Sequence, residues 1–372
     1  MSDNPSQSGS IIGRFRDLLA SVPYETKYIL LLFIGTRLVL TGLGLLARRF
    51  FPQNVQPPMS SFSFLNVWGV WDSYHYVHIA DSGYTSNAFY AFFPLYPLLM
   101  KALAYVIGNA FISGLIISNV CLLFASFYLY RLVLLEKESD TALESIKYLY
   151  LYPTAFVLSG VFTESLYLAL IIAGFYYAKK QRWWIVGMLG LLLSATRTIG
   201  VFFLLPMVYE YAKSKEFKLQ KIGLDAIPLL LIPVGLFCYM AYNYLMIGDP
   251  LGFGHVLTAE WGRQQLNPIL SVVYGLLQAK VNALIALACI AFLTVFYRKI
   301  GFSYWLVGVY SIILPLFSGI GSMHRYSLVA FPMYIILAEL SKNKYVEQFA
   351  PILLALAQGA LLVLWTCQIA VE

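Results

Sequence analysis

Charge of either sign is scarce in this sequence. Only 12% of its 372 residues are charged, whereas 60% are hydrophobic, and the mean hydropathy is +0.73. A water-soluble core cannot bury that much apolar surface, so the composition excludes an ordinary soluble protein. Apolar runs of about twenty residues recur along the chain, the length that a helix needs to cross a bilayer. Because these runs are continuously apolar rather than alternating, they predict an all-α polytopic membrane protein.

Paired cysteines and phosphate-binding glycine loops are also missing. The four cysteines lack C-x-x-C spacing and stand alone in apolar stretches, which is typical of small core residues: Cys121, Cys238, Cys289 and Cys367. The absence of a Walker motif argues against a nucleotide-driven pump and against a glycosyltransferase that uses nucleotide sugars in the cytosol. Cytoplasmic Lys and Arg explain the net charge of +7 better than nucleic-acid binding does.

The clusters of Lys and Arg set the expected topology. If all are cytoplasmic, each interval between clusters holds an even number of crossings. Residues 1–27 are then a cytoplasmic tail, and residues 28–372 form a single integral membrane domain. Its first external loop covers about residues 48–110, and the apolar part, 92–107, is expected to be an interfacial helix because Pro94 and Pro97 interrupt it.

About eleven crossings result from this topology, with the last beginning at Phe349. The four between 147 and 212 are short, and we expect them to be broken or tilted around a cavity. The other ten crossings are predicted at 28–47, 111–132, 147–163, 164–178, 183–197, 199–212, 222–247, 270–297, 302–320 and 326–341.

Acidic residues and histidines played no part in that assignment, yet most of the notable ones fall on or near the external face. Ionisable groups at membrane depth are costly and therefore indicate a site, which here is expected to be external. The residues concerned are Asp72, Asp81, Glu164, Asp249, Glu260, Arg197, Arg263, Arg325, His75, His78, His255 and His324.

The segment W-D-S-Y-H-Y-V-H-I-A-D-S-G-Y, from Trp71, predicts a short helix in the first external loop. Asp72 is either the N-cap of this helix or a general base beside the membrane. Asp81 follows nine residues later and points about 180° away, so the two carboxylates are not expected to act as a close pair. His75 and His78 suggest a divalent ion, but their spacing spreads them across the helix, and no cofactor is required by the sequence.

Three further positions are candidates for binding or orienting roles. Glu164 begins a helix, where it either favours the helix dipole or acts at the site. Arg197, in S-A-T-R-T-I-G, lies where two short helices meet and needs an anionic partner, either Glu164 or a ligand phosphate. The segment M-H-R-Y-S places His324 and Arg325 at an external turn, as interfacial caps or as ligand contacts. The role of Arg37, inside the first crossing, stays open.

These blocks together resemble the GPI mannosyltransferase II (PIG-V) family. The family carries W-D, I-A-E-x-G-Y and F-F-P where this chain has W-D, I-A-D-S-G-Y and A-F-F-P-L-Y-P from Ala91, and the resemblance continues through F-T-E-S-L-Y to about residue 205. It implies a GT-C glycosyltransferase that takes its sugar from a polyprenyl or dolichyl phosphate on the non-cytoplasmic face. The family's catalytic aspartate carries over to Asp72. Two positions depart from the family pattern, since Asp81 replaces Glu and R-T-I-G replaces R-S-N-G.

The residues and the resemblance lead to one hypothesis, a membrane mannosyltransferase with an inverting mechanism. Asp72 would deprotonate an acceptor hydroxyl, with Asp81, Glu164 and His75 as further acid or orienting groups. The donor phosphate would be bound by Arg197, His324 and Arg325. The acceptor, a glycan, glycolipid or protein, is not specified by the sequence. The membrane would be the plasma membrane of a prokaryote or the endoplasmic reticulum of a eukaryote. The alternatives are a transporter or flippase of lipid-linked sugars and a non-catalytic membrane scaffold.

Overall fold

The computed structural model describes residues 21–51 and 57–369. Within these residues helix accounts for 78% and no strand occurs, which confirms the all-α prediction. The first twenty residues of the expected cytoplasmic tail, including Arg14 and Arg16, lie outside the described ranges, as do residues 52–56 of the expected external loop.

Four helical segments in the described ranges are long and apolar enough to cross a membrane, and they make the chain an integral membrane protein. They are α2 (Tyr24–Phe50), α6 (Ala110–Leu134), the segment Leu224–Ile247 formed by η6 (Leu224–Leu231) and α11 (Val234–Ile247), and α19 (Lys344–Thr366). The count of about eleven crossings is not settled by these four and remains a prediction.

The shorter helices are interrupted by irregular or 3-10 segments, as their length suggested. They are α7 (Ser139–Leu151), η3 (Ala155–Ser159), α8 (Glu164–Lys179), α9 (Trp183–Ser194), η4 (Thr198–Phe203), α10 (Leu204–Ser214), η5 (Leu219–Lys221), α13 (Pro268–Gln278), α14 (Lys280–Val295), α15 (Tyr297–Ile300), α16 (Phe302–Ile313), η7 (Pro315–Ser318), α17 (Met323–Tyr326), η8 (Ser327–Val329) and α18 (Pro332–Leu340). Several of these breaks lie inside the protein, such as η3, in which all five residues are buried.

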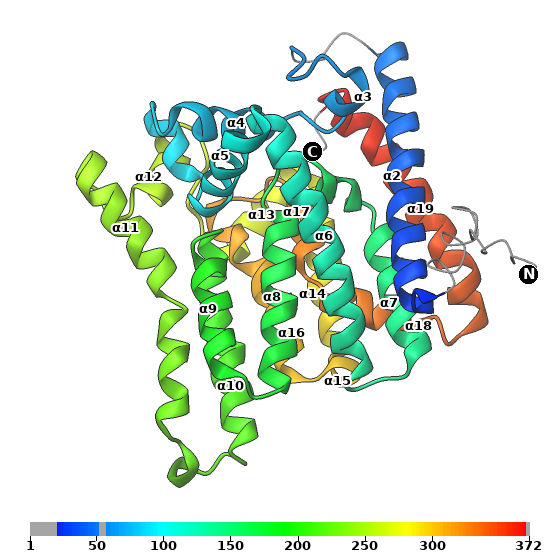
Figure 1. Cartoon of the computed structure of the whole chain (residues 1–372), viewed down its shortest axis with the longest axis vertical. Coiled ribbons are helices and arrows are strands. Elements are labelled where there is room, and N and C mark those ends of the chain that lie inside the picture. The colour runs from blue at the N-terminus through cyan, green and yellow to red at the C-terminus, as the bar shows by residue number, and fades with distance from the viewer. Residues whose placement is uncertain (1–20, 52–56, 370–372) are drawn as a thin grey trace, which may run out of the picture.

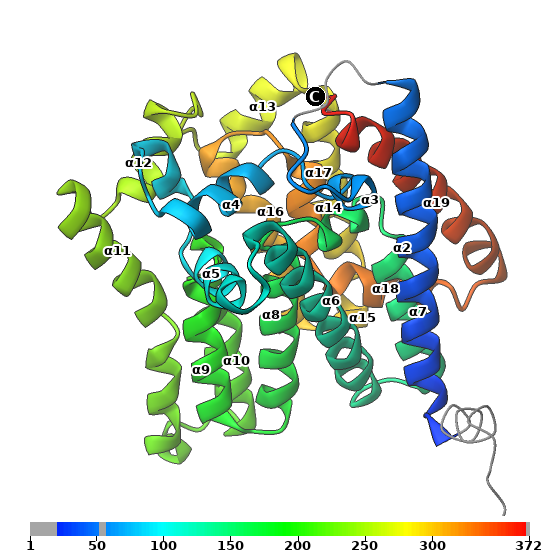
Figure 2. The same cartoon turned by 45° about the horizontal axis from the view of Figure 1, so that its top comes forward.

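The centre of the bundle is α8, which packs mainly against α6 and α9 (Figure 1). Its side chains are apolar around the whole circumference and most of them are buried, which is typical of a core helix. The pair α2 and α19 closes one side of the bundle, and α11 stands at the other side (Figures 1 and 2). The helix α8 is therefore fixed on all sides, and residues at its ends are held in defined positions.

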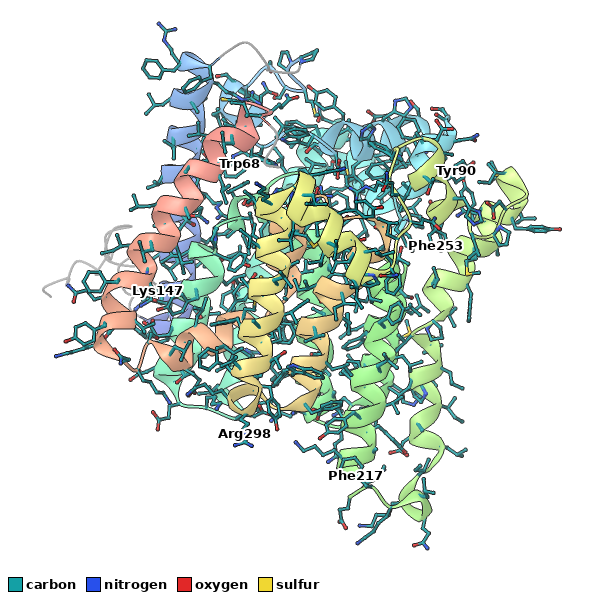
Figure 3. All side chains as sticks on the ribbon, turned by 180° about the vertical axis from the view of Figure 1, so that it is seen from behind. Trp68, Tyr90, Lys147, Phe217, Phe253 and Arg298 are labelled. Carbon is teal, nitrogen blue, oxygen red and sulfur yellow. The ribbon has the colours of Figure 1, made fainter. Side chains whose placement is uncertain are left out.

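The first long loop forms a helical layer at one end of the bundle. It contains α3 (Ser63–Asn66), α4 (Ser73–Ser82), η2 (Asn87–Ala91) and α5 (Leu95–Ile107), and α12 (Gly252–Ala259) packs on η2. We call this end, which also carries α17, the α4 end, and the opposite end with α10 and α15 the α10 end (Figure 2). Figure 3 shows Trp68, Tyr90 and Phe253 at the α4 end and Phe217 and Arg298 at the α10 end.

The predicted helices of this loop are present. The helix α4 ends at Gly83, whose φ of +78° favours glycine, and α5 begins after Pro94. Tyr105 and Val106 of α5 are 81% and 84% exposed, which leaves an apolar surface suited to lipid.

Arg37 is held inside the bundle by α2 and its neighbours. Its Nη1 donates to Ser159 Oγ at 2.8 Å, and its guanidinium lies 5.9 Å from the ring of Trp68 and 5.7 Å from that of Tyr150. These contacts stabilise a buried cation through aromatic faces and one hydroxyl. They tie α2 to η3, whereas Arg37 Nε and Nη2 are buried without a hydrogen-bond partner among the described residues.

Candidate functional site

Four segments that are distant in sequence meet at the α4 end. Asp72 precedes α4, Glu164 is the first residue of α8, Arg197 lies between α9 and η4, and Arg325 belongs to α17. Arg325 Nη1 donates to Asp72 Oδ2 at 2.5 Å, and Arg197 Nη1 donates to Glu164 Oε1 at 2.7 Å. Arg325 Nε lies 3.5 Å from the same Glu164 oxygen, so the four side chains form one network of alternating charge.

The interpretation of Asp72 as a capping residue is wrong. Asp72 occupies the N-cap position of α4, but its backbone is already helical and its carboxylate makes no capping hydrogen bond. The preceding Trp71 has a φ of +55°, and its Nε1 donates to Trp365 O at 2.9 Å. A positive φ is costly for a bulky residue and is kept only where the surroundings enforce it. This turn directs the carboxylate toward Arg325 instead of the helix backbone.

The Glu164–Arg197 pair is the most deeply buried part of the network. Glu164 is 1% exposed and the side chain of Arg197 is 14% exposed. A buried carboxylate needs a charged partner, which for Glu164 is Arg197. Of the two anionic partners expected for Arg197, Glu164 or a ligand phosphate, the structure shows Glu164. Arg197 also donates to Thr163 Oγ1 at 3.1 Å. Gly200 permits the turn after Arg197, because a Cβ at this position would lie 2.2 Å from a backbone carbonyl oxygen.

The short helix α17 is fixed by polar contacts from two other helical segments. Asn282 Oδ1, from α14, accepts a hydrogen bond from the Met323 N–H at 3.0 Å, and Thr154 Oγ1 donates to His324 O at 2.9 Å. Ser322, just before α17, has a φ of +64°. Strained non-glycine residues therefore precede both members of the Asp72–Arg325 pair, which is a feature of functional sites.

The charges of this network shift the pKa values of its members. Burial raises the pKa of Asp72, but the ion pair and hydrogen bond with Arg325 outweigh it, so the pKa lies below its ordinary value. Burial, with the nearby charge of Arg325, lowers the pKa of His324 to about 4. Asp72 is therefore an ionised carboxylate at neutral pH, whereas His324 is neutral and contributes a hydrogen bond rather than a positive charge.

A cavity of about 440 Å³ lies beside the network. Asp72, His324 and Arg325 line it, but Glu164 and Arg197 do not. Its other lining residues come from the α13–α14 junction, α19, the segment before α8 and two loops: Trp71, Phe156, Val157, Phe162, Arg263, Gln278, Ala279, Asn282, Gly321, Ser322, Leu361, Trp365 and Ile369. The cavity thus combines a charged wall with an apolar one, an arrangement suited to an amphipathic ligand.

Three predicted site residues face a different hollow. His75, His78 and Asp81 line an open groove of about 920 Å³ between α4, α5 and the start of α6. His75 packs against the rings of Phe89, Phe92 and Trp261, and His78 stacks on Phe89 with ring centroids 4.7 Å apart. Asp81 is exposed and lies on the side of α4 away from the network, as its spacing predicted. Over residues 21–51 and 57–369, no group of three His, Cys, Asp or Glu side chains could hold a metal ion.

Two further residues lie close to the network: Tyr326, which the sequence analysis did not single out, and Arg263, which it placed on the external face without a specific role. Tyr326 lies between two guanidinium groups, with its ring centroid 5.4 Å from Arg197 Cζ and 5.7 Å from Arg325 Cζ. Arg263 lines the cavity from the loop between α12 and α13. Burial raises the pKa of Tyr326, but Arg263, Arg325 and Arg197 together bring it below its ordinary value. In the sequence, Tyr326 is marked by its place inside the segment M-H-R-Y-S, and Arg263 by its place in an expected external loop.

The comparison with known families covers most of the chain. The Mannosyltransferase (PIG-V) family model matches residues 35–354, a range that contains every member of the network. The chain belongs to the PIG-V mannosyltransferase family. A search of curated proteins found no match. Family membership makes the chain a membrane mannosyltransferase and favours the enzyme over the transporter and scaffold alternatives.

Proposed function

We propose that this PIG-V mannosyltransferase transfers mannose from a polyprenyl-phosphate donor to an acceptor hydroxyl at the non-cytoplasmic face, with inversion. The observation that carries the proposal is the ionised Asp72, held by Arg325 on the wall of a cavity whose other wall is apolar. A lipid-linked donor has a charged head and a hydrocarbon tail, which match these two walls. Such a donor needs no cytosolic nucleotide-binding domain, and the sequence carries no phosphate-binding glycine loop.

The proposed step is a single displacement at the anomeric carbon. The acceptor oxygen forms a bond to C1 on the face opposite the phosphate, while the C1–O bond to the phosphate breaks and its electron pair stays on the phosphate. Asp72 accepts the acceptor proton as the new bond forms. Arg325, whose Nη1 binds Asp72, directs its remaining donors to the phosphate and stabilises the charge that develops there.

The buried Glu164–Arg197 pair has a positioning role in this proposal. The sequence predicted Arg197 as a phosphate ligand, but its side chain does not line the cavity. Glu164 lies 3.5 Å from Arg325 Nε, so the pair holds Arg325, which in turn holds Asp72. His324 is placed by Asn282, with its Nδ1 3.4 Å from Asn282 Oδ1, and as a neutral group it contributes a hydrogen bond to the ligand.

The proposed topology keeps about eleven crossings and a GT-C architecture. Each predicted crossing overlaps one of the following helical segments, although α7 begins at Ser139 and the third crossing was predicted at 147–163: α2, α6, α7 with η3, α8, α9, η4 with α10, η6 with α11, α13 with α14, α16 with η7, η8 with α18, and α19. Lys213, Lys218, Arg298 and Lys299 belong to segments at the α10 end, opposite the network (Figure 3). This separation supports a cytoplasmic α10 end and an external α4 end.

Thiol labelling tests the orientation. Ser86 is exposed at the α4 end and Lys218 is exposed near the α10 end, so each is replaced by cysteine in turn. An impermeant maleimide should label Ser86→Cys in intact cells and Lys218→Cys only after permeabilisation. Labelling of the unmodified chain, which has four cysteines of its own, gives the background in both cases. The reverse pattern would place the site in the cytosol and end the proposal of an external donor.

Transfer by the purified protein tests the chemistry. The reconstituted enzyme is incubated with polyprenyl-phosphate-mannose or GDP-mannose and with glycan, glycolipid and peptide acceptors. Only the lipid-linked donor should support turnover, with release of polyprenyl phosphate and a product of the opposite anomeric configuration by NMR. Turnover with GDP-mannose in the absence of lipid-linked donor would overturn the donor assignment, and retained configuration would overturn the single displacement.

A further inference from the structure

Among the residues that the structure describes, Arg263 has no hydrogen-bond or ion-pair partner for its side chain, which lies on the wall of the proposed donor cavity. It lies in the loop between α12 and α13 and lines the same cavity as Asp72 and Arg325. Across residues 21–51 and 57–369, its side chain makes no hydrogen bond and no ion pair, whereas Arg325 is bound to Asp72 and Arg197 to Glu164. A partly buried guanidinium that no carboxylate satisfies is poised to bind an anion.

The loop holds Arg263 in a defined position. Trp261, two residues earlier, donates from Nε1 to Ala88 O at 3.0 Å and packs its ring against His75 at 4.9 Å. Gly262 then has a φ of +62°, a conformation that glycine adopts without strain. The Arg263 N–H donates to Leu257 O at 2.8 Å, which fixes the backbone at Arg263 itself. The loop is therefore anchored on the α4 side by Trp261, and Arg263 reaches the cavity from this anchor.

Among the described residues of the network and the cavity lining, the charges leave one positive charge uncompensated. The pairs Asp72–Arg325 and Glu164–Arg197 are each neutral, and the adjacent His324 is neutral at pH 7. Arg263 supplies the excess, and its field is strong enough to lower the pKa values of both Asp72 and Tyr326. The hydrogen bond of Asp72 Oδ2 is made with Arg325 and not with Arg263.

We propose that Arg263 binds the phosphate of the lipid-linked donor and stabilises the phosphate as it leaves. The donor is a phosphodiester with one negative charge, which equals the excess charge of the wall. When the C1–O bond breaks, its electron pair gives the released phosphate a second negative charge, and Arg263 donates hydrogen bonds to the oxygen atoms that carry it. This inference rests on the proposed function and assigns the donor head group to a residue that no sequence motif indicated.

Lipid binding without turnover tests this role. Farnesyl phosphate serves as the probe and farnesol as its uncharged counterpart, and binding is followed by intrinsic fluorescence because Trp71 and Trp365 line the cavity. The full-length protein should bind farnesyl phosphate more tightly than farnesol. Arg263→Gln should weaken farnesyl phosphate binding by about ten- to hundredfold and leave farnesol binding unchanged, because only charge-assisted hydrogen bonds are lost. Arg263→Lys, which keeps the charge, should recover part of the affinity.

Arg298→Gln is the matched control, because Arg298 is exposed at the α10 end, away from the cavity (Figure 3). It should bind both probes as the unmodified chain does. If Arg263→Gln keeps the full preference for farnesyl phosphate, the role of Arg263 is wrong while a phosphate-bearing donor stands. If the unmodified chain binds farnesyl phosphate no better than farnesol, the phosphate-bearing donor fails, and the role of Arg263 fails with it.

Discussion

The central helix α8 carries a buried ion-pair cluster at each end, and the two clusters differ in kind. At its first residue, Glu164 pairs with Arg197 and contacts Arg325. At its last residue, Lys179 lies 2.8 Å from Glu136 and 3.1 Å from Glu210, whose Oε1 also accepts a hydrogen bond from Ser303. The helix has 16 residues, so about 22 Å separates the two clusters along its axis.

The difference between the clusters lies in the cations and in what surrounds them. The cluster at the α4 end uses arginines, whose planar guanidinium groups bind several oxygens at once, and it borders a cavity. The cluster at the α10 end uses one lysine over the ring of Tyr304, and none of its members lines either hollow. Burial of charge alone therefore does not mark a site. The cluster that borders a cavity is the one to which we assign the proposed chemistry, whereas the other cluster is assigned a packing role.

The largest expected effect comes from Asp72→Asn. The amide keeps the shape of the carboxylate and can still accept a hydrogen bond from Arg325, but it cannot take a proton. We expect transfer to fall by about a hundredfold or more while the protein folds normally. Turnover is measured with lipid-linked mannose as the donor. Size-exclusion and thermal-unfolding profiles check that the variant is folded. Near-normal turnover in folded Asp72→Asn would remove Asp72 from the chemistry.

Glu164→Gln tests the positioning pair. Loss of this buried charge leaves Arg197 without its ion-pair partner and loosens Arg325. Because the side chains of Asp72 and Arg325 then shift from their positions, we expect kcat to fall by about tenfold. We also expect the free energy of unfolding to fall by about 3 kcal/mol. Steady-state kinetics and chemical denaturation in detergent measure the two effects. A stability loss with unchanged kcat would show that the pair supports only the fold.

The dependence of transfer on pH tests the pairing of Asp72 with Arg325. The reaction needs the ionised carboxylate, and the pKa of Asp72 lies below its ordinary value, so kcat/KM should not fall on this account between pH 8 and about pH 5. In Arg325→Gln the main opposing charge is gone and burial raises the pKa of Asp72, so the acidic limb should move to higher pH. The measurement is kcat/KM of the unmodified protein and of Arg325→Gln between pH 4 and 8, from which the acidic limbs of the two profiles are compared. An unshifted limb would mean that another group controls it.

The smallest effect on transfer is expected from Glu210→Gln, in the cluster at the α10 end. Lys179 keeps Glu136 as a partner, so the free energy of unfolding should fall by only about 1–3 kcal/mol. Transfer should keep its kcat and donor KM, because the cluster lies at the far end of α8 from the cavity. Denaturation and donor titration measure both quantities. A changed donor KM would show that the two ends of α8 are coupled.

The parts of the fold that follow from local rules were predictable. The apolar runs predicted helices, Gly83 marked the end of α4, and the spacing of Asp81 placed it opposite Asp72. The helix expected at 92–107 is present as α5, which begins at Leu95. The sequence also named Asp72, Glu164, Arg197 and Arg325, the four residues that the fold brings together. It could not predict that the carboxylate of Asp72 binds Arg325 instead of capping α4, because this depends on the conformation of Trp71 and the position of α17.

The sequence by itself determined that this chain meets a membrane as helices, because the gain from removing apolar side chains from water and the cost of burying charged ones act on each segment separately. Tertiary structure alone decided which charges neutralise each other. Pairing depends on which segments the fold brings into contact. Asp72 and Arg325, for example, are 253 positions apart in the sequence. Among the described residues, the same packing leaves Arg263 at the cavity without an ion-pair partner, whereas Arg325 and Arg197 are paired with Asp72 and Glu164.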